Sequence, residues 1–173
     1  MASAALGFSA GTVLLAQQPA GPPKPGPETK KLEVFAGKWK GEAEMKPGPW
    51  GPGGKMTSEQ DCTWFDGGFQ LVCRESGSGA MGNMKSEAVL GWGMEDKEYK
   101  YQGISSDGMI GAANGTVNGN TWTWQSTDKM GGKVVHTRYT IVVTTPTSQT
   151  FKMETSPDGK TWTTAAEGKS TKS

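Results

Sequence analysis

From residue 38 to residue 171 the chain consists of short segments in which apolar and polar side chains alternate, separated by clusters of Gly, Pro, Asn and Asp. A period of two is typical of a β-strand that buries one face, and the intervening residues favour turns. The sequence therefore predicts strands at residues 38–46, 55–66, 69–77, 84–93, 97–105, 108–118, 121–128, 133–145, 149–155 and 160–171.

The connections between these segments are short, and their length restricts the topology. Asp66-Gly67-Gly68 and Asn118-Gly119-Asn120 are two of them, and both favour tight turns. Connections of this length join antiparallel neighbours only, because a parallel pair needs a long crossover. A series of hairpin-linked strands leaves no unpaired edge strand when its last strand pairs with its first. We therefore expect an all-β fold, a closed up-and-down antiparallel β-barrel of about ten strands; a two-sheet sandwich is the alternative.

Composition agrees with this fold and excludes several functions. The 26 Gly and 10 Pro disfavour a helical bundle, whereas 7 Trp, 5 Phe and 3 Tyr can fill a barrel. With a net charge of +1, the chain lacks the large excess of positive charge that would attract nucleic acid or an anionic membrane. One His and two Cys are too few for a zinc finger, and no nucleophile elbow or phosphate loop occurs. We assign no catalytic residue, no metal and no cofactor.

The first residues are expected to lie outside the barrel. Residues 4–16 form an apolar run that resembles the core of a secretory signal, although no Lys or Arg precedes Lys24. The run is too short to span a bilayer. We expect residues 1–20 to be a signal segment of an exported, periplasmic or extracellular protein, and residues 21–27 to be a Pro-rich linker. Residues 28–171 would then form a single domain.

That domain is expected to begin with a short helical turn. The turn carries Leu32 and Phe35 on one side and ends at Gly37. Trp39 follows at the start of the first strand, so we expect this end of the barrel to be closed.

Several motifs connect the chain to a protein family. These motifs are Gly37-Lys-Trp-Lys-Gly, Pro49-Trp-Gly-Pro-Gly-Gly-Lys-Met, Cys62-Thr-Trp-Phe-Asp-Gly-Gly-Phe, Gly115-Thr-Val and Thr121-Trp-Thr-Trp. Through them residues 28–171 resemble the bacterial DUF1579 family, and the Gly-x-Trp opening is similar to that of lipocalin-like barrels. The resemblance implies a lipocalin-like (calycin-like) barrel, often exported, with no established activity. Some lipocalin-like barrels bind haem through a His on the last strand; this chain has none there.

The two cysteines flank the Gly67-Gly68 turn symmetrically. A two-residue turn places Cys62 opposite Cys73 and Trp64 opposite Leu71, with the cysteines close enough for a disulfide. In an exported protein we expect that disulfide to form. Two buried free thiols that act as small apolar side chains are the alternative.

The methionines gather at one end of the expected barrel, because successive turns alternate between the two ends. The residues on this end are Met45, Trp50, Met56, Met81, Met84, Met109, Met130 and Met153. Flexible, polarisable thioethers suit a variable apolar ligand. We therefore expect a binding mouth lined by Met45, Trp50, Met81, Met84, Met109, Met130 and Met153. Further contacts are expected deeper in the barrel, at Trp64, Leu71 and Trp92.

Two other interpretations of the methionines stay open. The side chains can fill irregular gaps beneath the turns without leaving a cavity. Thioethers also bind Cu(I), but only one Met-x-x-Met run occurs, at residues 81–84, and His136 is far from it in sequence.

Glu75 is the carboxylate that this register directs toward the barrel interior. It lies opposite Gln60, and both share the inward parity of Cys73. Glu75 and Gln60 are therefore candidate polar anchors for a ligand, and burial would raise the pKa of Glu75. The alternative is a strand end that twists and exposes Glu75 to solvent. His136 shares its face with Arg138 and is expected to be a solvent-exposed sheet residue.

Three functions follow from this pattern. The first is non-catalytic binding of a small, mostly apolar molecule in the barrel mouth. The second is an envelope structural or interaction protein with a packed barrel, whose Thr-rich outer segments, such as residues 140–150, carry the partner contacts. The third is a small enzyme that uses Glu75 as a base. No nucleic-acid partner and no membrane span are expected, and the sequence makes no prediction of oligomeric state.

Overall fold

The structure, a computed structural model, describes residues 23–48, 51–80 and 82–173. A short helix and a 3-10 turn precede ten strands. The elements are α1 (Pro27–Lys31), η1 (Leu32–Phe35), β1 (Gly37–Met45), β2 (Gly54–Trp64), β3 (Gln70–Gly79), β4 (Gly82–Gly93), β5 (Glu98–Ser105), β6 (Ile110–Asn118), β7 (Thr121–Met130), β8 (Lys133–Thr145), β9 (Ser148–Ser156) and β10 (Thr163–Lys172).

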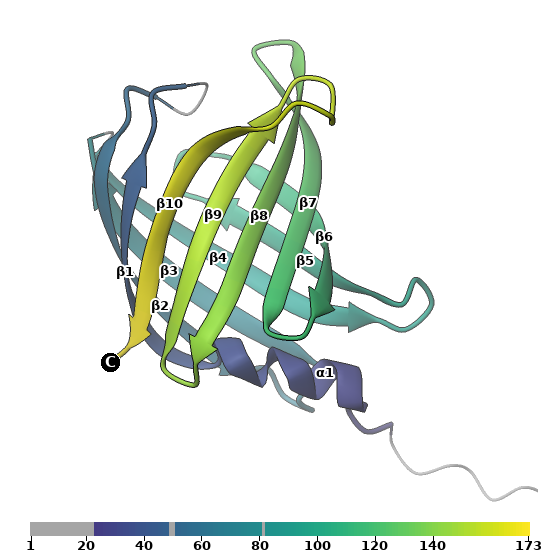
Figure 1. Ribbon diagram of the computed structural model, residues 1–173. Helices are drawn as coiled ribbons and strands as arrows, with labels where there is room; N and C mark the ends of the chain where they lie inside the picture. Colours follow the sequence, from purple (N-terminus) through teal and green to yellow (C-terminus); the bar gives the residue numbers. More distant parts are fainter. Residues whose placement is uncertain (1–22, 49–50, 81) are drawn as a thin grey trace, which may run out of the picture.

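Each strand pairs antiparallel with its neighbours in chain order, and β10 pairs with β1, so the sheet closes into a barrel (Figure 1). This confirms the predicted up-and-down barrel. The predicted bounds of the last strand differ most, since β10 begins at Thr163 rather than at residue 160. Asp158 explains the delay, because its Oδ1 accepts hydrogen bonds from the backbone N–H groups of Lys160 and Thr161, each at 2.8 Å, and holds them in the turn.

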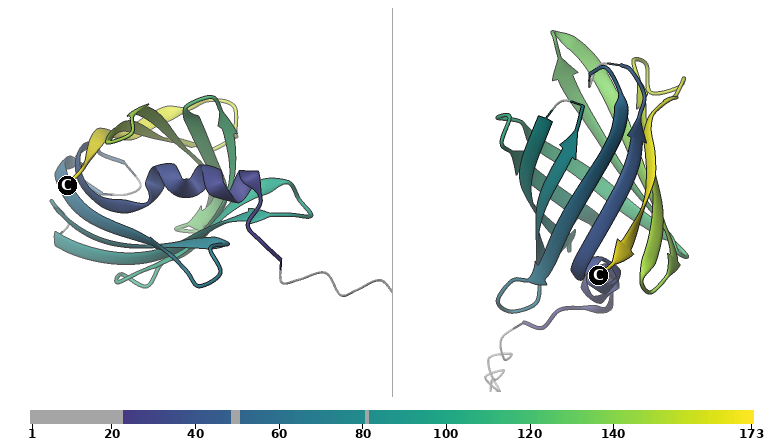
Figure 2. Two further views of the ribbon diagram at one scale, coloured as in Figure 1. Left: turned by 90° about the horizontal axis from the view of Figure 1, so that it is seen from below. Right: turned by 90° about the vertical axis from the view of Figure 1, so that its left-hand side faces the viewer.

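The helical segment closes one end of the barrel. Seen from below, it lies across the lower opening (Figure 2). Leu32 and Phe35 are buried, as predicted, and the Phe35 ring meets Trp122 edge-on at 4.9 Å between centroids. Three hydrogen bonds attach the segment to strands: Trp39 Nε1 donates to the Phe35 carbonyl, Trp64 Nε1 to Glu33, and the Tyr99 hydroxyl to Glu28. The expected closed end is therefore present.

The main apolar core lies directly above this segment. Its buried members are Leu32, Phe35, Cys62, Leu71, Cys73, Ala88, Leu90, Tyr99, Trp122, Trp124 and Ile141. Gly115 makes room for the stacked indoles, because a Cβ at that position would lie 2.6 Å from the Trp124 ring. The interior is thus filled at the lower end of the barrel.

The register of the β2–β3 hairpin agrees with the prediction. Cys62 pairs with Cys73, Trp64 with Leu71, and Gln60 with Glu75. The cysteines form the expected disulfide, with 4.0 Å between their Cα atoms, and both are buried in the core. The disulfide is compatible with an exported protein. The expected signal segment lies outside the described residues.

Candidate functional site

The inward side chains of the barrel fall into a buried lower group and a more accessible upper group. The upper group, at the end away from the helix, is partly exposed and includes Met45, Met56, Ser58, Glu75, Met84, Ser86, Tyr101, Ser126, Thr137, Tyr139 and Met153. These residues face the inside of the closed barrel and keep part of their surface accessible to solvent, whereas the core beside the helix is buried. We refer to the inside of the barrel at the accessible end as the upper lumen.

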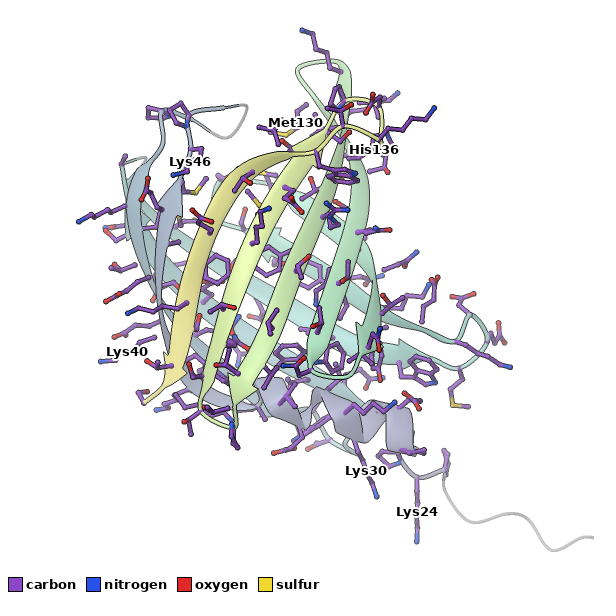
Figure 3. The ribbon with its side chains drawn as sticks, viewed as in Figure 1. Lys24, Lys30, Lys40, Lys46, Met130 and His136 are labelled. Carbon is purple, nitrogen blue, oxygen red and sulfur yellow. A yellow bond between two sulfur atoms is a disulfide. The ribbon has the colours of Figure 1, made fainter. Side chains whose placement is uncertain are left out.

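Five described methionines line the upper part of this lumen. They are Met45, Met56, Met84, Met130 and Met153, all on inward positions and all half-buried. Met130 lies at the upper end of the barrel, opposite the helix (Figure 3). Met153 pairs with both Tyr139 and Ala166, and Ala166 also pairs with Met45, so the two methionines lie in one row across β9, β10 and β1 with Ala166 between them.

The other predicted rim residues contribute less. Met109 follows β5 at the same end, but its side chain is 46% exposed in a turn. Met94, at the opposite end, is 75% exposed. Trp50 and Met81 lie outside the described residues.

The residues expected deeper in the pocket belong to the sealed base. Leu71 is completely buried in the core. Trp64 donates its indole N–H to Glu33 at 2.7 Å, and Trp92 packs edge-on against Tyr99 at 4.8 Å between ring centroids. Trp64, Leu71 and Trp92 therefore lie with the floor of the lumen rather than with its rim.

Glu75 points into the barrel. It lies on β3 between Gln60 of β2 and Ser86 of β4, and like Gln60 it is half-buried. Burial raises the pKa of the Glu75 carboxyl, and a hydrogen bond from the Ser58 hydroxyl offsets part of that rise. The alternative in which Glu75 is simply exposed is wrong, because the strand keeps its alternation through this position.

Two tyrosines complete a polar zone around Glu75. The Tyr101 ring lies over Gly103, where a Cβ would be 2.9 Å from the ring carbon that bears the hydroxyl, so the phenol extends along β5 toward the mouth. Tyr139 stacks on Phe151 at 5.4 Å between centroids. Burial, and after it the charge of Glu75, raises the pKa of both phenols. Glu75 on β3 and Tyr139 on β8 are far apart in sequence, and the closed barrel places both side chains on its inside.

His136 lies on the outer face of β8, as predicted, but it is half-buried rather than freely exposed (Figure 3). Its Nδ1 is 3.0 Å from the Thr127 hydroxyl, and a Cβ at Gly159 would lie 3.7 Å from its ring. The β9–β10 turn therefore covers the imidazole. On the same face, Arg138 pairs with Glu154 at 2.8 Å and lies 4.3 Å from the centre of the Trp162 ring.

Two grooves lie on the outside of the barrel. The larger, with a volume of about 1350 Å³, runs over β1, β2 and β7 to β10 and is lined mainly by outward polar side chains, Thr140 and Thr150 among them. The smaller, about 550 Å³, lies over β1 to β4 and is lined by outward charged side chains together with Trp39, Gln60 and Glu75. The sequence singled out the threonine-rich surface but not its concave shape, which comes from the curvature of the sheet.

Comparison with known families settles the relationship that the motifs indicated. Residues 24–172 match the family described as "Protein of unknown function (DUF1579)". The chain belongs to the DUF1579 family. No curated protein matches the sequence closely enough to count as a relative.

Solved structures show the same fold as this DUF1579 protein. An S-type phycobiliprotein lyase from Guillardia theta is 12% identical, with a TM-score of 0.60 over 83% of this chain and 91% of its own. Rv2717c from M. tuberculosis is also 12% identical, with a TM-score of 0.59 over 87% of this chain and 99% of its own. At this identity the likeness establishes the lipocalin-like barrel alone. No helix in the described part of the chain is long and apolar enough to span a membrane.

Proposed function

We propose that this protein binds a small, mostly apolar molecule in the mouth of its barrel without transforming it. The observation that carries the proposal is the row of half-buried methionines around an upper lumen whose lower end is sealed by aromatic side chains and a helix. An exposed thioether in a closed barrel has few protein partners to pack against. A ligand in the mouth would supply them.

The proposed contacts differ in chemistry with depth. The methionines at the rim adapt their rotamers to the shape of an apolar body. Trp50 and Met81 belong to the same proposed set on sequence grounds. Below them, Gln60 and Glu75 provide polar groups for orientation, and the core that contains Trp64, Leu71 and Trp92 forms the floor. Apolar walls with few polar groups are the usual composition of a small-molecule site.

The proposal is tested first by native mass spectrometry of the protein purified from its own host. A co-purifying small molecule supports binding, and a bare protein counts against it. A defined probe, 1-decanol, is then titrated by calorimetry into the wild type and into a Met45→Gln/Met153→Gln variant. Each amide has nearly the size of the thioether it replaces but is polar, so 1-decanol affinity should fall about tenfold.

A Met94→Gln variant is the matched control, because Met94 is at the other end of the barrel and faces solvent. It should bind 1-decanol as the wild type does. Equal affinities for all three proteins, or no binding to any, would contradict the proposal.

A second candidate function rests on the outer groove. Its threonines and mixed charges form a concave surface that suits a protein partner rather than an apolar small molecule. A photoreactive group placed at Thr150 should then cross-link to one host protein in cells, and the same group at Val89, exposed on β4 away from the groove, should not. Identical cross-linking from both positions would contradict a groove-specific partner.

A further inference from the structure

Glu75 has no cationic partner among the residues that the structure describes, whereas several carboxylates on the outside of the barrel have one; Asp61 and Glu167 are outward carboxylates that, like Glu75, lack an ion pair. Glu87, on the outer face of the neighbouring strand, pairs with Arg74 at 3.2 Å, and Glu154 pairs with Arg138 at 2.8 Å. Glu59, next to Gln60 but pointing outward, lies 3.7 Å from Lys40. A carboxylate that folding places inside without a counter-ion is costly for the protein and is often functional.

The groups near Glu75 leave part of its hydrogen-bonding capacity unused. Among the residues that the structure describes, the Ser58 hydroxyl is the one side-chain group that hydrogen-bonds to Glu75, whereas a carboxylate can accept several bonds. The field of Glu75 reaches the phenols of Tyr101 and Tyr139 and raises the pKa of each, after the larger effect of burial. Thr137, nearer the upper end of β8, has a buried hydroxyl with no hydrogen-bond partner in the described part of the chain. The lumen thus offers acceptors that the protein does not satisfy.

Within residues 23–48, 51–80 and 82–173, cations on inward strand positions are confined to the two ends of the barrel. Lys133 begins β8 at the rim, and Lys172 ends β10 at the base, with its Nζ 5.1 Å from the centre of the Trp39 ring. The other inward carboxylate of the upper half, Asp128, already accepts a hydrogen bond from Ser126 at 2.7 Å. The middle of the lumen therefore has a negative potential that favours a cation and opposes an anion.

Between Glu75 and the upper end of the barrel, the inside of β3 is lined by glycines and by the Met56 side chain of the neighbouring strand. The next inward residues on β3 are Gly77 and Gly79, so backbone rather than side chains lines the path to the mouth. The Met56 side chain covers them: a Cβ at Gly79 would be 2.7 Å from Met56 Cγ, and one at Gly77 would be 4.0 Å from its terminal methyl. Gly79 is four residues from Glu75, which corresponds to roughly 13 Å along a strand.

We propose that Glu75 is the recognition group of the lumen and that it selects cationic amphiphiles, with the ammonium head at Glu75 and an apolar body of about 13 Å along Met56 toward the rim. This inference rests on the proposed function, because it names the ligand class of the same mouth. An ammonium group would complete the hydrogen bonds of the carboxylate and replace the missing counter-ion. A carboxylate ligand of equal length would be repelled.

The test compares three probes that share one chain length, decylamine, 1-decanol and decanoate, by calorimetry at pH 7 and below their micelle-forming concentrations. Wild-type protein should bind decylamine about tenfold more tightly than 1-decanol, as expected for one charge-assisted hydrogen bond, and decanoate most weakly. Glu75→Gln keeps the shape of the side chain and should reduce decylamine affinity about tenfold, leaving 1-decanol within about twofold. Glu59→Gln removes the same charge from the outer face and should change none of the three.

The outcomes separate the two proposals. If 1-decanol binds but decylamine binds no better, or if Glu75→Gln leaves the preference for decylamine unchanged, the role of Glu75 is overturned and the apolar mouth stands. If none of the probes binds the wild type, both proposals fail. The wild-type comparison of the three probes decides the matter even if Glu75→Gln does not fold.

Discussion

Loss of the Cys62–Cys73 cross-link should destabilise the barrel by about 3 kcal/mol. The cysteines are 11 residues apart, and closing a loop of that length in the unfolded chain removes conformational entropy worth roughly 2.8 kcal/mol at 25 °C in the chain-entropy treatment. The surrounding hairpin should survive, because its register is also fixed by the pairs on either side, from Met56–Gly79 to Trp64–Leu71. For a chain of this size the loss corresponds to a fall in Tm of about 6–12 °C.

Urea unfolding with and without a reductant measures this effect. Reduction removes only the cross-link, whereas a Cys62→Ala/Cys73→Ala variant also removes two buried sulfurs, so the variant should have a lower urea midpoint than the reduced wild type. The variant itself should be insensitive to the reductant. An unchanged wild-type midpoint on reduction would refute the reasoning, since it would mean that the cross-link does not restrict the unfolded chain.

Three further perturbations give distinct signatures. Tyr99→Phe removes the hydroxyl that donates to Glu28, so it should cost about 1–2 kcal/mol and speed amide exchange in α1 more than in β8; equal exchange would show that the bond does not hold the helix. Gly115→Ala places a Cβ 2.6 Å from the Trp124 ring and should cost about 1–3 kcal/mol and alter near-ultraviolet circular dichroism; an unchanged spectrum would contradict this. Burial raises the pKa of the Glu75 carboxyl in the folded protein, so protonation of Glu75 favours folding. This stabilisation is complete below the pKa that Glu75 has in the unfolded chain, and it is lost as the pH rises through the pKa that Glu75 has in the folded protein. Glu75→Gln should therefore gain stability relative to wild type as the pH rises above the pKa of an unfolded glutamate, by at most about 1.4 kcal/mol per pH unit. A stability difference that does not change with pH would contradict the assignment.

The β2–β3 hairpin shows how much of this fold the sequence could predict. The two glycines at residues 67–68 lie at the centre of the β2–β3 connection, and every pair on that ladder follows by counting outward from them, including Cys62 with Cys73 and Gln60 with Glu75. The connection itself is longer than the predicted two-residue turn, because β2 ends at Trp64 and β3 begins at Gln70. The alternation of burial along the other strands could be predicted for the same reason. Local patterns carry this information because side-chain direction in a strand depends only on position along it.

The candidate site could be predicted only in part. The inward direction of Glu75 followed from parity, but its proximity to Tyr139 depends on the closure of the whole barrel, which no local pattern encodes. The positions of Trp64 and Trp92 at the floor depend on the helical segment, because Glu33 accepts the Trp64 hydrogen bond and Tyr99, the neighbour of Trp92, bonds to Glu28. His136 is covered by the β9–β10 turn, which follows the neighbouring strand, so counting along β8 alone predicted too much exposure for its side chain.

The pairing of β10 with β1 also has a consequence for how the protein is made. Trp39, near the beginning of the described chain, lies opposite Lys172, near its end, and the N–H of Ser173 bonds to the Lys38 carbonyl. The hairpins can form one after another during synthesis, but the barrel cannot close until β10 has been added. Until then the nascent protein has two unpaired edge strands. Loss of one strand by truncation would leave two such edges permanently free to pair with other chains.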